Sequence, residues 1–365
     1  MRFTQKSFRM IKVAILCPYP VGEAPSQRFR IEQYLSWLDT QHIHTTSYPF
    51  LSESAWEIFY HSNKPIAKSF QILLGFIRRF MLLGRLISVD FVFIHREAAP
   101  LGPPIFEWLI AKVLRKRIIY DFDDAIWLPN YSKQHRFIHR LKAYWKVKFI
   151  IRWTYRVSVG NEFLAEYASR YNARVDVIPT TIDMNYHALD SVLSRSTVPV
   201  IGWTGTHTTV EYLRPIVPAL EKLAAVQAFE FVVISNEPPA FPIPNLRFVR
   251  WNKTTEIEDL SQFSMGLMPL EDTEWAKGKC GFKALQYMAL GIPTIVDKVG
   301  VNSSIITHGQ DGFIAQTSED WFEYMNTLLS DPSRGRMLGD NAQACVLNRF
   351  SVQANQEKYR SLFTL

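Results

Sequence analysis

The chain has 365 residues, more than the roughly 250–300 at which a single hydrophobic core stops growing, so two domains are expected. With 47% hydrophobic and 21% charged residues, the composition is globular and excludes collagen, a coiled coil and extensive disorder. The net charge of +7 is unevenly distributed: residues 1–183 contain 26 Lys and Arg against 15 Asp and Glu, and the remainder contain 15 against 19. The basic half indicates an anionic partner, which could be nucleic acid, a membrane or a phosphorylated substrate.

The cysteine and hydropathy patterns indicate a cytoplasmic protein. Cys17, Cys280 and Cys345 lie far apart and share no metal-ligand spacing, as in a reduced protein without structural zinc. Lys12 interrupts the first apolar run and no small-residue cleavage site follows, so we interpret this run as a strand, not a signal peptide. The apolar segment 72–86 contains three arginines and falls short of the roughly 20 apolar residues that a membrane span needs.

In the first half of the chain, short apolar runs alternate with helical patterns, which is typical of a parallel sheet built from βαβ units. The predicted strands are 11–17, 90–94, 117–120, 157–159 and 175–178. The predicted helices between them are 27–38 and 105–114.

The second half repeats this alternation after a polar, weakly patterned segment at 184–197, which we predict to be an interdomain linker. Its predicted strands are 198–203, 229–234, 247–249, 265–268 and 294–296. Its predicted helices are 210–225 and 282–289, and 333–365 is helical.

These elements predict an α/β protein with two Rossmann-like, doubly wound parallel-sheet domains that face a cleft. We expect residues 1–190 to form the first domain and residues 191–345 the second. Residues 346–365 are expected to form a helix that packs back on the first domain.

The segment 268–293 is the most informative for chemistry. A loop with small residues and lysines leads directly into a predicted helix, so backbone N–H groups and the positive helix end, with Lys279 and Lys283, suit a diphosphate. The alternative is a surface loop with two solvated lysines.

This segment resembles the C-terminal signature of the retaining GT-B glycosyltransferases, the family 4-like glycosyl transferases group 1, which build bacterial polysaccharides and glycolipids. The matching positions are Gly281, Leu285, Met288, Gly291 and Pro293. The resemblance continues upstream through IGWTGT, PLED and GK, and downstream through DG and RFS. It implies a nucleotide-diphosphate sugar as co-substrate, no cofactor and no metal.

Two glutamates of the family signature are replaced in this chain. The position beside the donor sugar is Gly278, and the position that binds the donor ribose is Gln286, whose amide can still hydrogen-bond ribose hydroxyls. An acidic contact could come instead from Glu271, Asp272 or Glu274. The family's diphosphate-binding Arg and Lys are also missing from the loop after the first strand of this half, so we assign their role to Lys279 and Lys283. The backbone amides of Thr204–Thr206 are expected to assist them.

The remaining donor contacts are expected at the carboxyl ends of strands, where such folds bind ligands. Trp251 would either stack on the base or fill the core, and the core is the better interpretation. The full set of predicted donor-binding residues is Gly202, Thr204, Gly205, Thr206, Ser235, Asn236, Trp251, Asp272, Gly278, Gly281, Phe282 and Gln286.

The first half supplies the predicted acceptor site. Its PYPVGEAPSQRFR segment resembles the family's acceptor-side glycine loop, and the predicted acceptor-binding residues are Gly22, Ser26, Arg28 and Arg96. Arg28 would hold a phosphate or lie solvated in the first turn of a helix.

Candidate catalytic groups lie at two strand ends of the first half. His95 ends one strand, where the family often has a histidine near the donor sugar, although a structural histidine is the alternative. Asp121, Asp123 and Asp124 follow the next strand and would act as an acceptor-orienting group, a base, a cation site or loop caps. Repulsion among them is expected to favour protonation of at least one. The predicted catalytic residues are His95, Asp123, Asp124, Lys279 and Lys283.

Two basic segments, 64–85 and 133–152, contain no acidic residue. In the second, Ile138, Leu141, Trp145 and Phe149 share one helical face, which is the pattern of a basic amphipathic helix on an anionic membrane. A core helix with a solvated basic face is the equally weighted alternative.

We therefore predict a cytoplasmic glycosyltransferase, peripheral on the inner face of the membrane, that transfers a sugar with retention to a polysaccharide or lipid-linked acceptor. The alternatives are a non-catalytic sugar-nucleotide-binding or assembly subunit and another GT-B activity such as nucleotide-sugar epimerisation. Nucleic acid is the weakest partner, because the basic half has no helix-turn-helix, zinc-finger or RNA-stacking motif.

Overall fold

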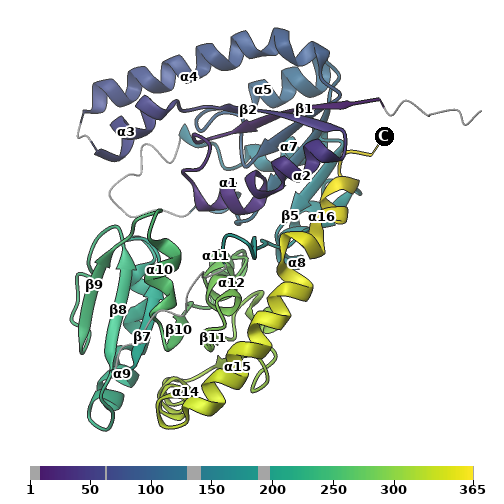
Figure 1. Ribbon diagram of the computed structural model, residues 1–365. Helices are drawn as coiled ribbons and strands as arrows, with labels where there is room; N and C mark the ends of the chain where they lie inside the picture. The colour runs from purple at the N-terminus through teal and green to yellow at the C-terminus, as the bar shows by residue number, and fades with distance from the viewer. Residues whose placement is uncertain (1–8, 62–63, 130–140, 188–197, 365) are drawn as a thin grey trace, which may run out of the picture. The chain divides into compact units, whose positions relative to one another are not determined.

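The computed structural model describes residues 9–61, 64–129, 141–187 and 198–364. The chain divides into two compact units, Met1–Pro179 with Gln356–Leu365, and Thr180–Asn355 (Figure 1). Each unit contains one parallel six-stranded sheet in an α/β arrangement, as the sequence predicts.

The sheet of the first unit has the strand order β2-β1-β3-β4-β5-β6, and all its neighbouring strands are parallel. Its central strands are runs of Val, Ile and Phe whose side chains are buried on both faces, as parallel sheets between helices require. The strands are β1 (Ile11–Cys17), β2 (Ile43–Pro49), β3 (Phe91–His95), β4 (Arg117–Phe122), β5 (Arg156–Val159) and β6 (Val175–Val177).

The helices of the first unit include one long helix, α4 (Pro65–Arg85), which Figure 1 shows along the outer side of this unit, near α3 and α5. The others are α1 (Pro25–Arg30), η1 (Glu32–Tyr34), α2 (Leu35–Thr40), α3 (Glu53–His61), η2 (Leu86–Ser88), α5 (Ile105–Trp108), η3 (Leu109–Val113), α7 (Lys146–Trp153) and α8 (Glu162–Ser169).

A buried arginine attaches α4 to the sheet. Arg79 is 3% exposed and donates hydrogen bonds to the carbonyl oxygens of Ala98, Tyr48 and Cys17 at 2.7, 2.6 and 2.9 Å. Burial lowers the pKa of Arg79 to about 10, which still leaves it charged at neutral pH. The guanidinium thereby satisfies backbone carbonyls at the ends of β1 and β2 that water cannot reach.

The sheet of the second unit has the order β12-β11-β10-β7-β8-β9 and is also parallel throughout. Its strands are β7 (Val200–Thr204), β8 (Glu230–Ser235), β9 (Leu246–Arg250), β10 (Met265–Met268), β11 (Thr294–Asp297) and β12 (Phe313–Ala315). Its helices are η5 (Val210–Ile216), α9 (Val217–Ala224), α10 (Glu256–Ser261), α11 (Glu274–Lys277), α12 (Phe282–Ala289), α13 (Asn302–Ile305), α14 (Ser318–Ser330), α15 (Pro332–Cys345) and η6 (Val346–Phe350).

The last helix, α16 (Val352–Ser361), belongs to the first unit from Gln356 onward. Tyr359 stacks on Tyr34 with ring centroids 4.1 Å apart, and Phe363 packs edge-on against Phe91 at 6.0 Å. The C-terminal segment thus completes the core of the first unit.

The predicted strands all form, within one or two residues at their ends, but three helix predictions need correction. The helix predicted over 27–38 is interrupted at Ile31, whose φ of −131° is not helical. The helix predicted over 210–225 begins as a 3-10 segment up to Ile216, with Pro215 inside it. In the basic segment, 133–140 lies outside the described residues, and Ala143, at φ +50°, separates Leu141 from α7.

Among the described residues, no helix combines the length and the apolar character needed to cross a bilayer.

Candidate functional site

A chain of polar contacts lies at the carboxyl ends of β3 and β4 in the first unit. The Oγ atom of Ser26, on α1, is 2.8 Å from Nε2 of His95 and donates a hydrogen bond to Asp123 at 2.9 Å. The other ring nitrogen of His95, Nδ1, is 2.9 Å from Oδ2 of Asp121. The structure therefore brings together three of the predicted site residues, Ser26, His95 and Asp123.

Asp121 is the last but one residue of β4, so it lies within the strand and not after it. It is fully buried and paired with Arg30, whose Nη2 and Nε atoms lie 2.5 and 3.3 Å from the carboxylate oxygens. Arg30 also donates to Ser158 at 3.2 Å and to the carbonyl of Ile178. Arg30 lies in the same glycine-loop motif as Ser26 and Arg28 but is not among the predicted site residues, because only the fold shows which of the two arginines is buried.

Asp123 and Asp124 are held by Arg96. The guanidinium donates to Asp123 Oδ1 at 2.9 and 2.7 Å and to Asp124 Oδ2 at 2.6 Å. Arg96 has a left-handed backbone, φ +61°, which turns the chain after β3 so that its side chain reaches both carboxylates. Arg96, predicted as an acceptor contact, is in this structure engaged with the two predicted catalytic aspartates.

Two carboxylates of this cluster, Asp121 and Asp123, have a pKa below that of free aspartate. Burial opposes ionisation of Asp121, but the Arg30 charge and the His95 contact outweigh it, so the pKa of Asp121 is lowered. The Arg96 charge likewise overcomes burial and lowers the pKa of Asp123. Neither Asp121 nor Asp123 is therefore the protonated carboxylate that the sequence predicts, because a paired arginine outweighs like-charge repulsion at each of them.

The glycine loop before α1 is fixed by side chains. Gly22 has φ +87°, which favours glycine, and its N–H donates to Glu32 at 2.8 Å. Buried Gln27 donates to the carbonyl of Tyr19 at 3.0 Å and to Glu32 at 2.6 Å. Arg28 is half-buried, with its guanidinium 5.1 Å from the ring centroid of Phe29. The loop is thus a rigid support for Ser26 and Arg28.

In the second unit, the loop after β7 uses its own amides internally. The N–H of Thr204 donates to the Tyr287 hydroxyl at 2.9 Å, that of Gly205 to the Ile234 carbonyl at 3.0 Å and that of Thr206 to Thr209 at 3.0 Å. The predicted phosphate role of these three amides is therefore not available in this structure. The hydroxyls of Tyr287 and Thr209 and the carbonyl oxygen of Ile234 accept these three hydrogen bonds.

Gly202 also has a packing role. A Cβ atom there would lie 2.2 Å from the ring of Phe263, so only glycine allows this ring to pack against β7. Gly202 lies inside the strand and is buried, which places it in the core instead of at the strand end.

Ser235 is the last residue of β8 and Asn236 follows it, at the same edge of the sheet as the loop after β7. Asn236 accepts from the His207 N–H at 2.8 Å, and its Nδ2 lies 2.8 Å from His207 Nδ1. Trp251 is half-buried and packs against the core cluster that contains Ile234 and Phe263, in agreement with its core interpretation.

The lysine-rich segment forms as predicted, with α12 spanning Phe282–Ala289. Gly281 is the N-cap at φ +69°, and a Cβ atom there would lie 2.1 Å from Ile305, so two constraints require glycine. The ammonium groups of Lys279 and Lys283 lie 5.0 and 5.3 Å from the ring centroids of Trp275 and Trp203. The segment thus gathers two cations at the start of α12.

Other members of the segment are placed around these lysines. Gly278 is buried and ends α11, Phe282 and Lys283 are half-buried in the first turn of α12, and Asp272 is exposed. Asp272 lies 3.5 Å from the ammonium group of Lys277.

Gln286 contacts a carboxylate that sequence analysis missed. Its Nε2 atom is 3.3 Å from Oε1 of Glu256, the first residue of α10, and both side chains are buried, at 4% exposed each. The position where the family has a glutamate is thus an amide, but a carboxylate lies beside it, 30 residues away in the sequence. The one feature that marks Glu256 is that it is a buried acid at the start of a short helix, and burial cannot be read from the sequence.

Gln286→Glu, which restores the family residue, is expected to lower the free energy of unfolding by about 2–3 kcal/mol at pH 7, because two buried carboxylates would meet. The exchange variant Glu256→Gln/Gln286→Glu restores one amide and one carboxylate and should recover most of the loss. Urea unfolding of the three proteins checks this. An exchange variant as unstable as the single variant would contradict the pairing.

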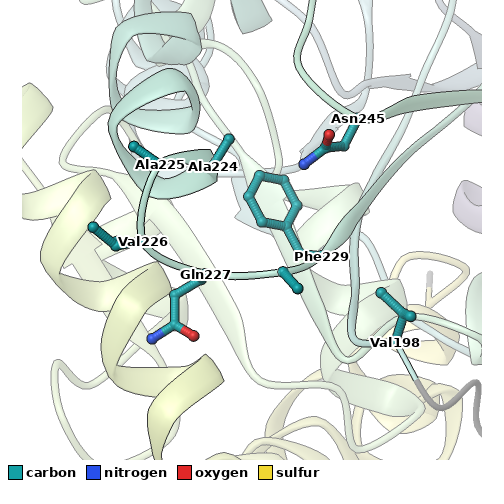
Figure 2. A pocket seen from close by; sticks show the side chains of 8 residues that line it. Val198, Ala224, Ala225, Val226, Gln227, Phe229 and Asn245 are labelled. Carbon is teal, nitrogen blue, oxygen red and sulfur yellow. The ribbon is translucent and has the colours of Figure 1, made fainter.

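A hollow of the second unit lies at the opposite edge of its sheet. Figure 2 shows Val198, Phe229 and Asn245, which precede β7, β8 and β9, with the chain turn after α9. Because Ser235 and Asn236 lie at the carboxyl ends of these strands, this hollow is separate from the predicted donor residues.

The comparison with protein families decides the class of the second unit. Residues 198–331 match the family model described as glycosyl transferases group 1. The chain carries a group 1 glycosyltransferase domain. The residues matched include the loop after β7, the Glu256–Gln286 pair and the lysines at the start of α12, so these lie in the glycosyltransferase domain.

The fold of this glycosyltransferase is GT-B, as similarity to solved structures shows. Sucrose-phosphate synthase from Thermosynechococcus elongatus is 14% identical, with a TM-score of 0.69 over 97% of this chain and 99% of that chain. Anabaena HepE in complex with UDP-glucose is 14% identical, with a TM-score of 0.68 over 97% and 100%. A glycosyltransferase from Rickettsia africae is 13% identical, with a TM-score of 0.66 over 98% and 99%. A search of curated protein sequences gave no match.

Proposed function

We propose that the protein transfers a sugar from a nucleotide-diphosphate sugar to a polysaccharide or lipid-linked acceptor, with retention of configuration. The observation that carries the proposal is the pair of cations, Lys279 and Lys283, at the start of α12 within the glycosyltransferase domain. Both a helix N-terminus and lysine ammonium groups stabilise a diphosphate, and more so as the sugar departs and negative charge develops.

The donor is proposed to bind the second unit. Gly281 and Phe282 begin α12 beside the two lysines, and the Gln286–Glu256 pair offers an amide and a carboxylate for ribose hydroxyls. HepE has been solved with UDP-glucose, which makes a uridine diphosphate sugar the first donor to test.

The acceptor is proposed to bind the first unit through Ser26, with Gly22, Arg28 and Arg96 around it. Ser26 has one hydroxyl hydrogen, which it donates to Asp123, so its oxygen accepts from Nε2 of His95. One lone pair of the Ser26 oxygen is then left for an acceptor hydroxyl. Nδ1 of His95 faces Asp121, so this carboxylate fixes the orientation of the ring beside Ser26.

The proposed mechanism needs no metal. Asp123 and Asp124 share the single charge of Arg96, and their proposed role is structural: Asp123 holds Ser26, and both fix the loop that orients the acceptor. Catalysis is then substrate-assisted: the departing diphosphate takes the proton of the attacking acceptor hydroxyl, while Lys279 and Lys283 stabilise its charge.

We propose that the protein acts at the cytoplasmic face of a membrane, where lipid-linked acceptors are held. The basic character of the first half of the chain, 26 Lys and Arg against 15 Asp and Glu, supports an anionic surface as its partner.

A uridine diphosphate sugar is expected to raise the melting temperature by about 5 °C or more at a hundredfold excess over its dissociation constant, because a ligand that binds only the native state stabilises it by about 2.7 kcal/mol. A thermal-shift screen across nucleotide-diphosphate sugars measures this, with the matching nucleoside monophosphates as controls. No shift with any donor would contradict the proposal.

A second candidate, a non-catalytic sugar-nucleotide-binding subunit, is favoured by one observation. Gly278 provides no side chain where the family has its glutamate beside the donor sugar. Donor binding without turnover, measured over a panel of glycan and lipid-linked acceptors, would favour this candidate over the enzyme.

A further inference from the structure

The outward face of α4 is apolar. Its exposed side chains recur at spacings of three and four residues, which places them along one side of a helix about 31 Å long. They are Ile66, Phe70, Leu73, Ile77, Phe80 and Met81, from 45% to 85% exposed. We call this set the α4 stripe.

The inward face of α4 differs from that of an ordinary amphipathic helix in that a glycine and a charged residue are among its buried residues. It contains Gly75, buried Arg79 and Leu82. A Cβ atom at Gly75 would lie 2.5 Å from the ring of Phe50, so the helix backbone lies directly on that ring. The helix is therefore fixed by close backbone packing, by the Arg79 hydrogen bonds and by two aromatic contacts with buried Phe106, from Phe76 at 5.9 Å and from Phe80 at 4.8 Å between ring centroids. Phe80 is thus the stripe residue that also helps to attach the helix.

The apolar surface continues beyond α4. Ile105 and Trp108 of α5 are 48% and 45% exposed, and Leu141 and Trp145 are 46% and 53% exposed. Single exposed apolar residues are ordinary, but a long row of them with aromatic neighbours marks an interaction surface.

The charges on α4 and next to α5 are basic, whereas the neighbouring α3 carries exposed Glu53 and Glu57. Segment 64–85 carries five Lys and Arg and no acid. Next to α5, the exposed basic residues are Lys112, Arg115 and Lys142, while the one acid of α5, Glu107, is 2% exposed. An apolar surface with a basic border is complementary to an anionic lipid bilayer.

The surface also contains an apolar hollow of about 270 Å³ between α4 and α5. Its wall includes Phe76, Phe80, Leu101, Ile105, Phe106 and Leu141. An apolar space of about 150 Å³ already holds a benzene-sized molecule, so this one has room for part of a hydrocarbon chain. Because Phe80, Ile105 and Leu141 are also partly exposed, the hollow opens onto the apolar surface.

We propose that the α4 stripe is the face by which the protein docks on an anionic bilayer, and that one lipid hydrocarbon chain enters the hollow between α4 and α5. This inference rests on the proposed function only in that the bilayer would present the acceptor. The inference extends the predicted membrane contact of segment 64–85. For the second predicted membrane contact, it replaces a continuous helix over 133–152 with α5, Leu141 and Trp145.

The first test is sedimentation of the full-length protein with vesicles of phosphatidylglycerol and phosphatidylcholine. Wild type is expected to bind vesicles rich in phosphatidylglycerol, and Phe70→Glu/Ile77→Glu to bind at least tenfold more weakly. The matched control is Met337→Glu/Leu347→Glu, at 51% and 52% exposed positions of the second unit, which should bind like wild type. Equal binding by wild type and the stripe variant, or no binding by wild type, would overturn docking through this face.

The second test concerns the hollow and uses phosphatidylglycerol with brominated acyl chains, which quench nearby tryptophans. Quenching of wild type is expected to fall in Trp108→Phe, because Trp108 lies on the same face. Ile105→Phe/Leu141→Phe fills the hollow with apolar atoms and should halve the quenching or more while vesicles still bind. Unchanged quenching in the filled variant would overturn chain entry.

A donor-binding measurement separates this inference from the proposed function. The stripe variant should show the wild-type melting-temperature rise with the donor sugar nucleotide and the wild-type melting temperature without it. If wild type binds vesicles but no donor, the proposed function fails and the docking face stands.

Discussion

Replacing Arg30 with methionine is expected to lower the free energy of unfolding by about 3–5 kcal/mol at pH 7, because it leaves Asp121 buried without its ion-pair partner. Both side chains are at most 2% exposed, and water cannot take the place of the guanidinium. Urea unfolding measures the loss. Arg28→Met, on the same turn at a half-buried position, is the matched control and should cost less than about 1 kcal/mol.

Asp121→Asn distinguishes an ion pair from simple packing. If the charge of Asp121 causes the loss, the double variant Arg30→Met/Asp121→Asn will be more stable than the sum of the single effects implies. Strictly additive losses would contradict the pairing.

The loss in Arg30→Met should also shrink on acidification. In wild type, the pKa of Asp121 is lowered, so its stabilisation is present above the pKa of unfolded aspartate and disappears as the pH falls through the folded value. In the variant, burial raises the pKa of this carboxyl and the penalty grows as the pH rises. The difference between the two proteins is therefore expected to be smaller at pH 4 than at pH 7.

Lys279→Ala/Lys283→Ala is expected to reduce turnover by about a thousandfold or more while the fold stays intact, since each lysine is proposed to stabilise charge on the departing diphosphate. The measurement is the rate of sugar transfer from the donor that the thermal-shift screen identifies. Circular dichroism and the melting temperature report on folding.

Lys277→Ala is the matched control for these lysines. Lys277 lies in the same segment but is paired with Glu274 at 3.0 Å and Asp272 at 3.5 Å, on the exposed side of α11. Loss of such a surface pair should change turnover by less than about threefold. Wild-type turnover by the double variant would contradict the assignment of the diphosphate site.

Much of the fold follows from local sequence patterns. The strands with continuous apolar runs, such as β1 and β10, and the helix α12 have the predicted bounds. By contrast, β2 and β12 were not predicted. β2 is only partly buried and rich in Thr and His, and β12 has three residues, so neither carries a strong apolar signal.

The site was predictable in position but not in its contacts. Strand ends correctly place His95, Ser235 and Asn236, because the carboxyl ends of parallel strands share one edge. The partners of these groups are set by distant segments: Ser26 meets His95 across 69 residues. Arg30 and Glu256 are not among the predicted site residues, because they matter through being buried. The residues next to them in the sequence do not reveal that burial.

Because of the buried Arg79, the attachment of α4 to the protein and the character of its outer face are separate properties. Most surface helices do not separate them. In an ordinary helix, apolar residues hold it to the protein, and changing them unfolds the domain. Here the guanidinium, Gly75 and the contacts of Phe76 and Phe80 with Phe106 hold the helix, so the other outer residues are free to vary with the surroundings of the protein. A variant in which Ile66, Phe70 and Ile77 are polar should therefore be easier to purify and crystallise, with the same sheet beneath it.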